Sequence, residues 1–283
     1  MGKLPLVRTG KTLGFTEEYC KFNSRLKLYR NSCGDYEPAE LLVCTRNIFN
    51  PDGVELSARV PKEFKLVIPE PPDRAANEAR AVRRAKTALF DYIRCNPDLC
   101  WFVTLTFDGQ LVDRTNYVEI VKLFNTWADN RVRRKGLKYI GVIERHKQSN
   151  GLHFHFIMND VLAKVDSGTV SCKGRKRPIR RETADRYKIP LVDRKIVYNL
   201  PEWKYGFSTM IRITDDDGLV KTASYLSKYL TKDFEKIGGR YYYHSNNLYA
   251  PKYEYFNSSY KDVDAGYEWE VDEACASFKI IRY

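Results

Sequence analysis

Clusters of apolar residues mark out several strands from about residue 100 onwards. WFVTLTF (residues 101–107) has the aromatic and β-branched content of a buried strand. YIGVIE (139–144) and GLHFHFIM (151–158) are typical of two strands joined by a tight turn through residues 148–150. YGFSTMIRIT (205–214) predicts another strand.

Apolar residues at helical spacing occur before, between and after these strands. Residues 115–134 carry apolar side chains three and four positions apart, which predicts an amphipathic helix. A further helix is expected over VKTASYLSKYLTKDF (220–234), and another from a capping Asp73 to Arg94. From residue 101 the order is strand, helix, strand, strand, strand, helix. This order predicts an α+β fold, in which helices pack on an antiparallel sheet.

The two ends of the chain differ from this regular part. An N-terminal extension, residues 1–72, contains two short apolar runs, Glu40–Cys44 and Phe64–Ile68, that predict strands, and it ends in a stiff proline-rich linker. No chemistry can be assigned to it from the sequence. The main domain is expected over residues 73–260.

The remaining residues, 261–283, form an acidic C-terminal tail. Asp262 to Glu273 contains six acidic and no basic residues. Such a run is typical of a mobile or regulatory end.

Charge narrows the class of partner. Lys and Arg outnumber Asp and Glu by 48 to 36, which gives a formal net charge of +12. This excess favours a polyanionic partner such as nucleic acid, although charge alone is equally compatible with a basic protein that has no special partner. The stretch from Lys173 to Arg181 is the strongest candidate for contacts with phosphate.

Cysteine usage and hydropathy limit the cellular setting. The seven cysteines are odd in number and form no C-x-x-C pair, which argues against a disulfide framework and a zinc ribbon. The first residues lack the apolar run of a signal peptide, and no apolar stretch approaches membrane-spanning length. We therefore expect a cytoplasmic protein.

His153 and His155 are the most informative residues of the sequence. Alternate residues of a strand point to the same face, so both imidazoles leave the sheet together. If the preceding turn holds an even number of residues, Glu144 of the neighbouring strand faces the same side, and His146 falls there too. A lone His-x-His is usually an accident of composition. The facing carboxylate makes a metal site the better prediction.

A second candidate group lies in the last predicted helix. Tyr225 and Tyr229 are four residues apart and project from one face of that helix, with Lys228 beside both. Tyrosines at this spacing are more often part of a packing stripe than nucleophiles, so the pair carries little weight by itself.

Taken together, these motifs resemble the HUH endonuclease superfamily, and within it the rolling-circle replication initiators of small single-stranded phages and related mobile elements. WFVTLTF resembles the first motif of that family. Glu144 with His153 and His155 resembles its histidine motif with the upstream acidic ligand, and Tyr225 to Lys232 resembles its two-tyrosine motif. The resemblance covers about residues 73 to 256 and implies an HUH nuclease core, which is ferredoxin-like.

The resemblance also implies a mechanism. His153, His155 and Glu144 would bind Mg²⁺ or Mn²⁺, although this ligand set also suits zinc. Tyr225 or Tyr229 would attack single-stranded DNA at an origin hairpin or nick site, with help from Lys228, and would form a 5′-phosphotyrosine link. The released 3′ hydroxyl would prime a host polymerase, and a separate host helicase is expected because the sequence has no ATP site.

Two other functions remain open at this stage. A non-catalytic single-stranded nucleic-acid-binding protein would use the same sheet, basic loops and the tyrosines of residues 241–255, but it needs no facing carboxylate and histidines. A metal-dependent hydrolase that uses water would cut DNA without becoming attached to it.

Overall fold

The computed structural model describes residues 24–44, 74–146, 149–175, 177–214, 216–232, 236–256, 269–273 and 276–282. The chain divides into two compact units. The central unit is Pro72–Ala250, and the terminal unit combines Met1–Pro71 with Pro251–Tyr283. Each is described separately below.

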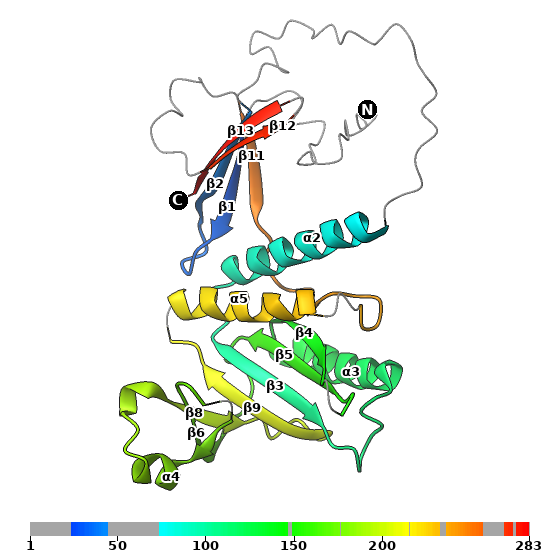
Figure 1. Ribbon diagram of the computed structural model, residues 1–283, viewed down its shortest axis with the longest axis vertical. Coiled ribbons are helices and arrows are strands. Elements are labelled where there is room, and N and C mark those ends of the chain that lie inside the picture. Colours follow the sequence, from blue (N-terminus) through cyan, green and yellow to red (C-terminus); the bar gives the residue numbers. More distant parts are fainter. Residues whose placement is uncertain are drawn as a thin grey trace, which may run out of the picture. The chain divides into compact units, whose positions relative to one another are not determined.

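The central unit is built on an antiparallel sheet with the strand order β10-β4-β5-β3-β9-β8-β6-β7. The strands predicted from the sequence form its middle, and β3 lies between β5 and β9 (Figure 1). The bounds are β3 Trp101–Phe107, β4 Tyr139–Arg145, β5 Leu152–Met158, β6 Val165–Cys172, β7 Ile179–Arg180, β8 Arg194–Asn199, β9 Gly206–Arg212 and β10 Tyr243–His244.

One face of this sheet packs against α3, Tyr117–Lys135. Asn116 caps the helix by accepting hydrogen bonds from two backbone N–H groups, and Gly136 ends it in the left-handed conformation at φ 68°. Phe124 is 1% exposed and stacks on Phe154 of β5, with 4.0 Å between ring centroids. This aromatic core explains why every second residue of β3 is buried.

The other face carries α2 (Arg74–Arg94) and α5 (Asp216–Lys232), which contact each other and β4. Leu89 of α2 and Leu226 of α5 are fully buried in a second core with Ile140 and Ile157 of the sheet. Helices therefore cover both faces of an antiparallel sheet, and the predicted α+β fold is confirmed (Figure 1).

The basic stretch after β5 contains elements that the sequence did not predict. It forms β6, β7, the short helix α4 (Arg181–Arg186), a 3-10 turn (Leu191–Asp193) and β8, which widen the sheet beyond β9. Two of its arginines have internal partners: Arg181 pairs with Asp166, and Arg194 pairs with Asp185. Part of the positive charge therefore holds this extension together.

The terminal unit contains a second antiparallel sheet, with the order β11-β1-β2-β13-β12. Its strands come from both ends of the chain: β1 Ser24–Arg30 pairs with β11 Lys252–Phe256, β2 Tyr36–Cys44 pairs with β13 Ala276–Arg282, and β12 Trp269–Glu273 pairs with β13. The run Glu40–Cys44 lies in β2 as predicted, and Phe64–Ile68 lies outside the described residues.

Among the helices that the structure describes, none is both long and apolar enough to cross a membrane.

Candidate active site

The β4–β5 hairpin brings the predicted acidic residue opposite the first histidine. Glu144 is the direct cross-strand partner of His153, so the predicted register is confirmed. The Glu144 side chain leans along the strands, and its Oε2 lies 3.1 Å from Nε2 of His155. Both side chains are largely buried, with 18% of Glu144 and 11% of His155 exposed. A carboxylate and an imidazole thus meet in a sheltered place.

The neighbouring strand β3 holds the other nitrogen of each imidazole. Thr104 lies opposite His155 and Thr106 opposite His153 in the β3–β5 pairing. Their hydroxyl oxygens lie 3.0 Å and 3.1 Å from Nδ1 of His155 and His153, respectively. Because Nδ1 is engaged on the sheet side, each Nε2 is directed away from β3. When Nδ1–H donates to threonine, Nε2 keeps a lone pair that can bind a cation.

His153 lies in surroundings that favour the neutral imidazole. Burial lowers its pKa, and positive charge on His155, His146 or Arg114 lowers it further, while Glu144 acts in the opposite direction. The neutral form is the one that binds a metal ion. His153 is therefore suited to a ligand's role at physiological pH.

The donor set fits a hard divalent cation in type and partly in spacing. Two neighbouring ligands of one cation lie roughly 3 Å apart when each is about 2.1 Å from it. The 3.1 Å between Glu144 and His155 matches this value. The rings of His153 and His155 are nearly parallel at 13°, with centroids 6.4 Å apart. Within the part of the chain that the structure describes, no three His, Cys, Asp or Glu side chains surround one point as a metal site does.

His146 also lies on this side of the hairpin, as the sequence indicates. Its ring centroid is 5.6 Å from that of His153, and its Nδ1 accepts a hydrogen bond from the backbone N–H of Ser149 at 3.4 Å. The residue follows the last residue of β4 and is exposed. Glu144 and His146 are the two candidates for the third ligand. Glu144 is the more firmly positioned, because it lies inside the strand and is partly buried.

Tyr225 of α5 lies next to the histidines, with one aromatic ring between them. Its ring meets Phe102 of β3 edge to face, with 5.7 Å between centroids. Phe102 in turn lies parallel to the His155 ring at 6.1 Å. Tyr225 is 44% exposed, so its phenol is accessible to a substrate. Lys228 is exposed on the same helix, and the side chain of Tyr229 lies outside the described residues.

Four residues of this site, Phe102 among them, were not singled out from the sequence. Thr104 and Thr106 belong to the strand motif 101–107. Their alternation with apolar residues was the feature of the sequence that could have pointed to them. Arg114 gave no signal, because it lies in the loop before α3. Its backbone C=O accepts a hydrogen bond from Leu152 N–H at 2.9 Å, which ties this loop to the start of β5.

Comparison with known proteins supports one class of protein. Residues 100–234 match the family of replication-associated proteins described as ORF2/G2P. The matched segment runs from the start of β3 to the end of α5, so it contains every residue of the candidate site. The match supports a replication initiator family and a role in DNA replication. No curated protein and no solved structure matches the chain.

Proposed function

We propose that this protein initiates replication by nicking and rejoining single-stranded DNA through a 5′-phosphotyrosine link. One observation carries the proposal: Glu144 and His155 are in contact, and the Phe102 ring adjoins both His155 and an exposed Tyr225. A nucleic-acid-binding protein without catalytic activity needs no such arrangement. The family match over the same residues agrees with it.

Glu144, His153 and His155 would hold Mg²⁺ or Mn²⁺, which supplies positive charge that polarises the scissile phosphate. Thr104 and Thr106 keep the two imidazoles fixed by their bonds to Nδ1. Burial of His153 keeps that ring neutral, and the adjoining carboxylate contributes negative charge that favours cation binding. The threonines thus act as positioning residues behind the ligands.

Tyr225 is the nucleophile in this proposal. Its phenol oxygen forms a bond to phosphorus while the bond from phosphorus to the 3′ oxygen breaks. The phenol gives up its proton and the 3′ oxygen gains one, so one phosphate diester replaces another. Rejoining therefore needs no nucleoside triphosphate. Lys228, three residues further along α5, is the cation that would assist the attack in this proposal.

Tyr229 would provide the second nucleophile. On a helix it follows Tyr225 by one turn, about 6 Å along the axis. A second cut made while the first 5′ end is still attached to Tyr225 needs such a group. The released 3′ hydroxyl would prime a host polymerase, and a host helicase would open the duplex.

The test uses single strands that tile the DNA on both sides of the coding sequence, incubated with the protein and Mn²⁺. In a 5′-phosphotyrosine link the protein is attached to the downstream fragment. A 3′ label should therefore migrate with the protein on a denaturing gel, while a 5′ label is released on a shortened strand. Tyr187→Phe, at an exposed tyrosine beyond α4, is the matched control for Tyr225→Phe. Cutting without attachment would indicate a hydrolase that uses water, and neither cutting nor attachment would indicate a binding protein.

A further inference from the structure

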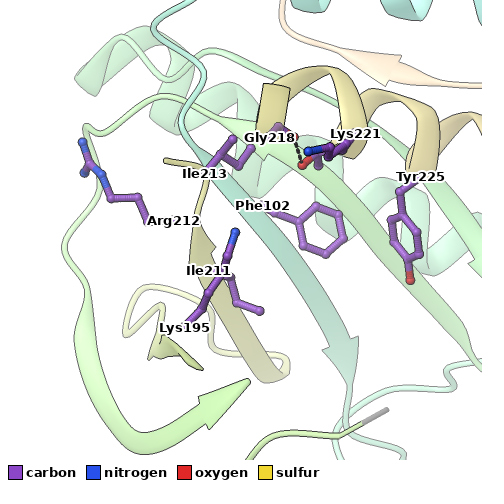
Figure 2. A pocket seen from close by; sticks show the side chains of 9 residues that line it. Phe102, Lys195, Ile211, Arg212, Ile213, Gly218, Lys221 and Tyr225 are labelled. Carbon is purple, nitrogen blue, oxygen red and sulfur yellow. Dashed lines mark hydrogen bonds between the residues drawn. The ribbon is translucent and has the colours of Figure 1, made fainter. Parts of the chain in front are cut away.

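A pocket of about 250 Å³ opens directly beside Tyr225 (Figure 2). It lies between the first turns of α5 and the strands β3, β9 and β8. Two of its residues also belong to the candidate active site. Phe102 is the ring that adjoins His155, and Tyr225 is the proposed nucleophile. Whatever binds in this pocket is therefore held next to the bond that Tyr225 would attack.

The floor of the pocket is apolar. Phe102 and Ile211 are direct partners in the β3–β9 pairing, so their side chains leave the sheet on the same face and lie next to each other. Both are only partly buried. Ile213 extends this surface toward α5. Partly exposed apolar side chains such as Phe102 and Ile211, an aromatic ring among them, suit the face of a nucleic-acid base.

The rim of the pocket is basic on two sides. Lys195 comes from β8 and Lys221 from α5, and both are exposed. Figure 2 shows the Lys195 side chain extending toward the space beside Phe102. The two lysines come from segments more than twenty residues apart, so the sheet and α5 together bring them to one pocket.

Arg212 borders the pocket but points elsewhere. Its guanidinium donates to Asp160 Oδ2 at 3.4 Å and lies over the Trp101 ring at 5.4 Å. Figure 2 shows its side chain turned away from Phe102 and Tyr225. Arg212 is therefore left out of the proposed binding surface.

We propose that this pocket binds one nucleotide of the single strand, the one adjacent to the phosphate that Tyr225 attacks. The base packs on Phe102 and Ile211, and the phosphate of the same nucleotide is bound by Lys195 and Lys221. The volume is near the lower limit of small-molecule sites, roughly 300 Å³, which suits a single nucleotide rather than a longer stretch. The inference rests on the proposed function for its position beside the scissile bond, whereas the binding itself can be measured without cleavage.

The first test measures binding of a fluorescein-labelled 20-nucleotide oligothymidine by anisotropy in EDTA, at several salt concentrations. The variant Lys195→Gln/Lys221→Gln should bind at least fivefold more weakly. Its slope of log affinity against log salt should be smaller by roughly 0.7, because the two lysines bind one phosphate and each phosphate that the protein neutralises on a single strand contributes about 0.7 to the slope.

The matched control is Lys122→Gln/Arg133→Gln, which also removes two charges. Both residues are exposed on α3, which covers the opposite face of the sheet. Its affinity should stay within twofold of the unchanged protein. Equal losses in the two double variants would overturn the pocket, because they would show a general effect of net charge. Competition by thymidine 5′-monophosphate at micromolar concentration would also overturn it, because it would indicate a site for free nucleotides.

The second test locates the base. Oligothymidine with one 5-iodouracil is cross-linked by light, and the attached peptides are identified by mass spectrometry. The proposal expects attachment in the segments that contain Phe102 or Tyr225. Attachment confined to residues 241–255 would overturn it.

The two proposals fail in different ways. If Tyr225 becomes linked to DNA but the pocket variant binds oligothymidine normally, the proposal that the pocket binds a nucleotide is wrong and the proposed function remains. If the pocket variant loses binding while the unchanged protein never forms a link to DNA, the pocket remains and the proposed function is wrong.

Discussion

Thr104 and His155 lie directly opposite each other in neighbouring strands, with 3.0 Å between the threonine Oγ1 and the imidazole Nδ1. Thr106 and His153 repeat the same relationship two residues further along, at 3.1 Å. Behind the proposed metal site, β3 therefore supplies a hydroxyl to Nδ1 of each imidazole, and Nε2 of His155 faces Glu144.

Thr104→Val tests that layer, because valine keeps the shape of threonine and removes the hydroxyl. Removing an outer-layer partner typically costs about 10–100-fold in metal affinity. We expect weakening of this size for Mn²⁺, measured by titration followed with electron paramagnetic resonance, whereas Thr104→Ser should stay close to the unchanged protein. Equal Mn²⁺ affinity in the valine and serine variants would mean that the hydroxyl has no positioning role.

His153→Ala and His155→Ala should each abolish formation of the protein–DNA link in Mn²⁺. Binding of single-stranded DNA, measured by anisotropy in EDTA, should change less than about threefold, because affinity comes mainly from distributed phosphate contacts. Glu144→Ala should raise the Mn²⁺ concentration needed for half-maximal activity more than His146→Ala does. The reverse order would identify His146 as the third ligand.

The tyrosine pair is tested by Tyr225→Phe, Tyr229→Phe and the double variant. If the two phenols alternate, each single variant keeps some formation of the protein–DNA link and the double variant keeps none. Inactivity in only one single variant would identify a one-nucleophile enzyme. A link formed by the double variant would place the nucleophile elsewhere in the chain.

Part of the basic stretch should contribute salt-sensitive affinity without sequence preference. Lys173, Arg177 and Arg180 are exposed, whereas Arg181 pairs with Asp166. Replacing those three with Gln should reduce the salt slope for oligothymidine by about 0.7 for each phosphate that is no longer neutralised. Arg181→Gln should instead act mainly on the β6 extension, which the melting temperature would reveal. An unchanged slope in the triple variant would exclude this segment from the DNA interface.

Phe124→Ala probes the aromatic core on the opposite face. Phe124 stacks on Phe154 at 4.0 Å and is 1% exposed, so the deletion should lower the free energy of unfolding by about 3–5 kcal/mol. Urea unfolding followed by circular dichroism measures this decrease. Val118→Ala, on the exposed side of the same helix, should stay within about 0.5 kcal/mol.

Local sequence patterns were enough to predict many of the strands and helices of this protein. The alternation in WFVTLTF and GLHFHFIM predicts both the strands and the faces of their side chains, because successive residues of any strand point to opposite sides. The spacing of Tyr225 and Tyr229 places them one turn apart for the equally local reason of helix geometry. For Glu144 and the histidines, the sequence predicted a shared face only for a turn with an even number of residues, and the structure pairs Glu144 with His153.

The tertiary structure alone decided which of these elements are neighbours. That β3 lies beside β5, so that Thr104 meets His155, depends on strand order, which no local pattern encodes. The contact of Tyr225 with Phe102 and the convergence of Lys195 and Lys221 on one pocket depend on how α5 packs across the sheet. The pairing of strands from the two chain ends is similarly invisible in sequence, because it joins residues more than 200 positions apart. Such contacts arise from the burial of whole faces, and the identity of the partner face is a property of the complete fold.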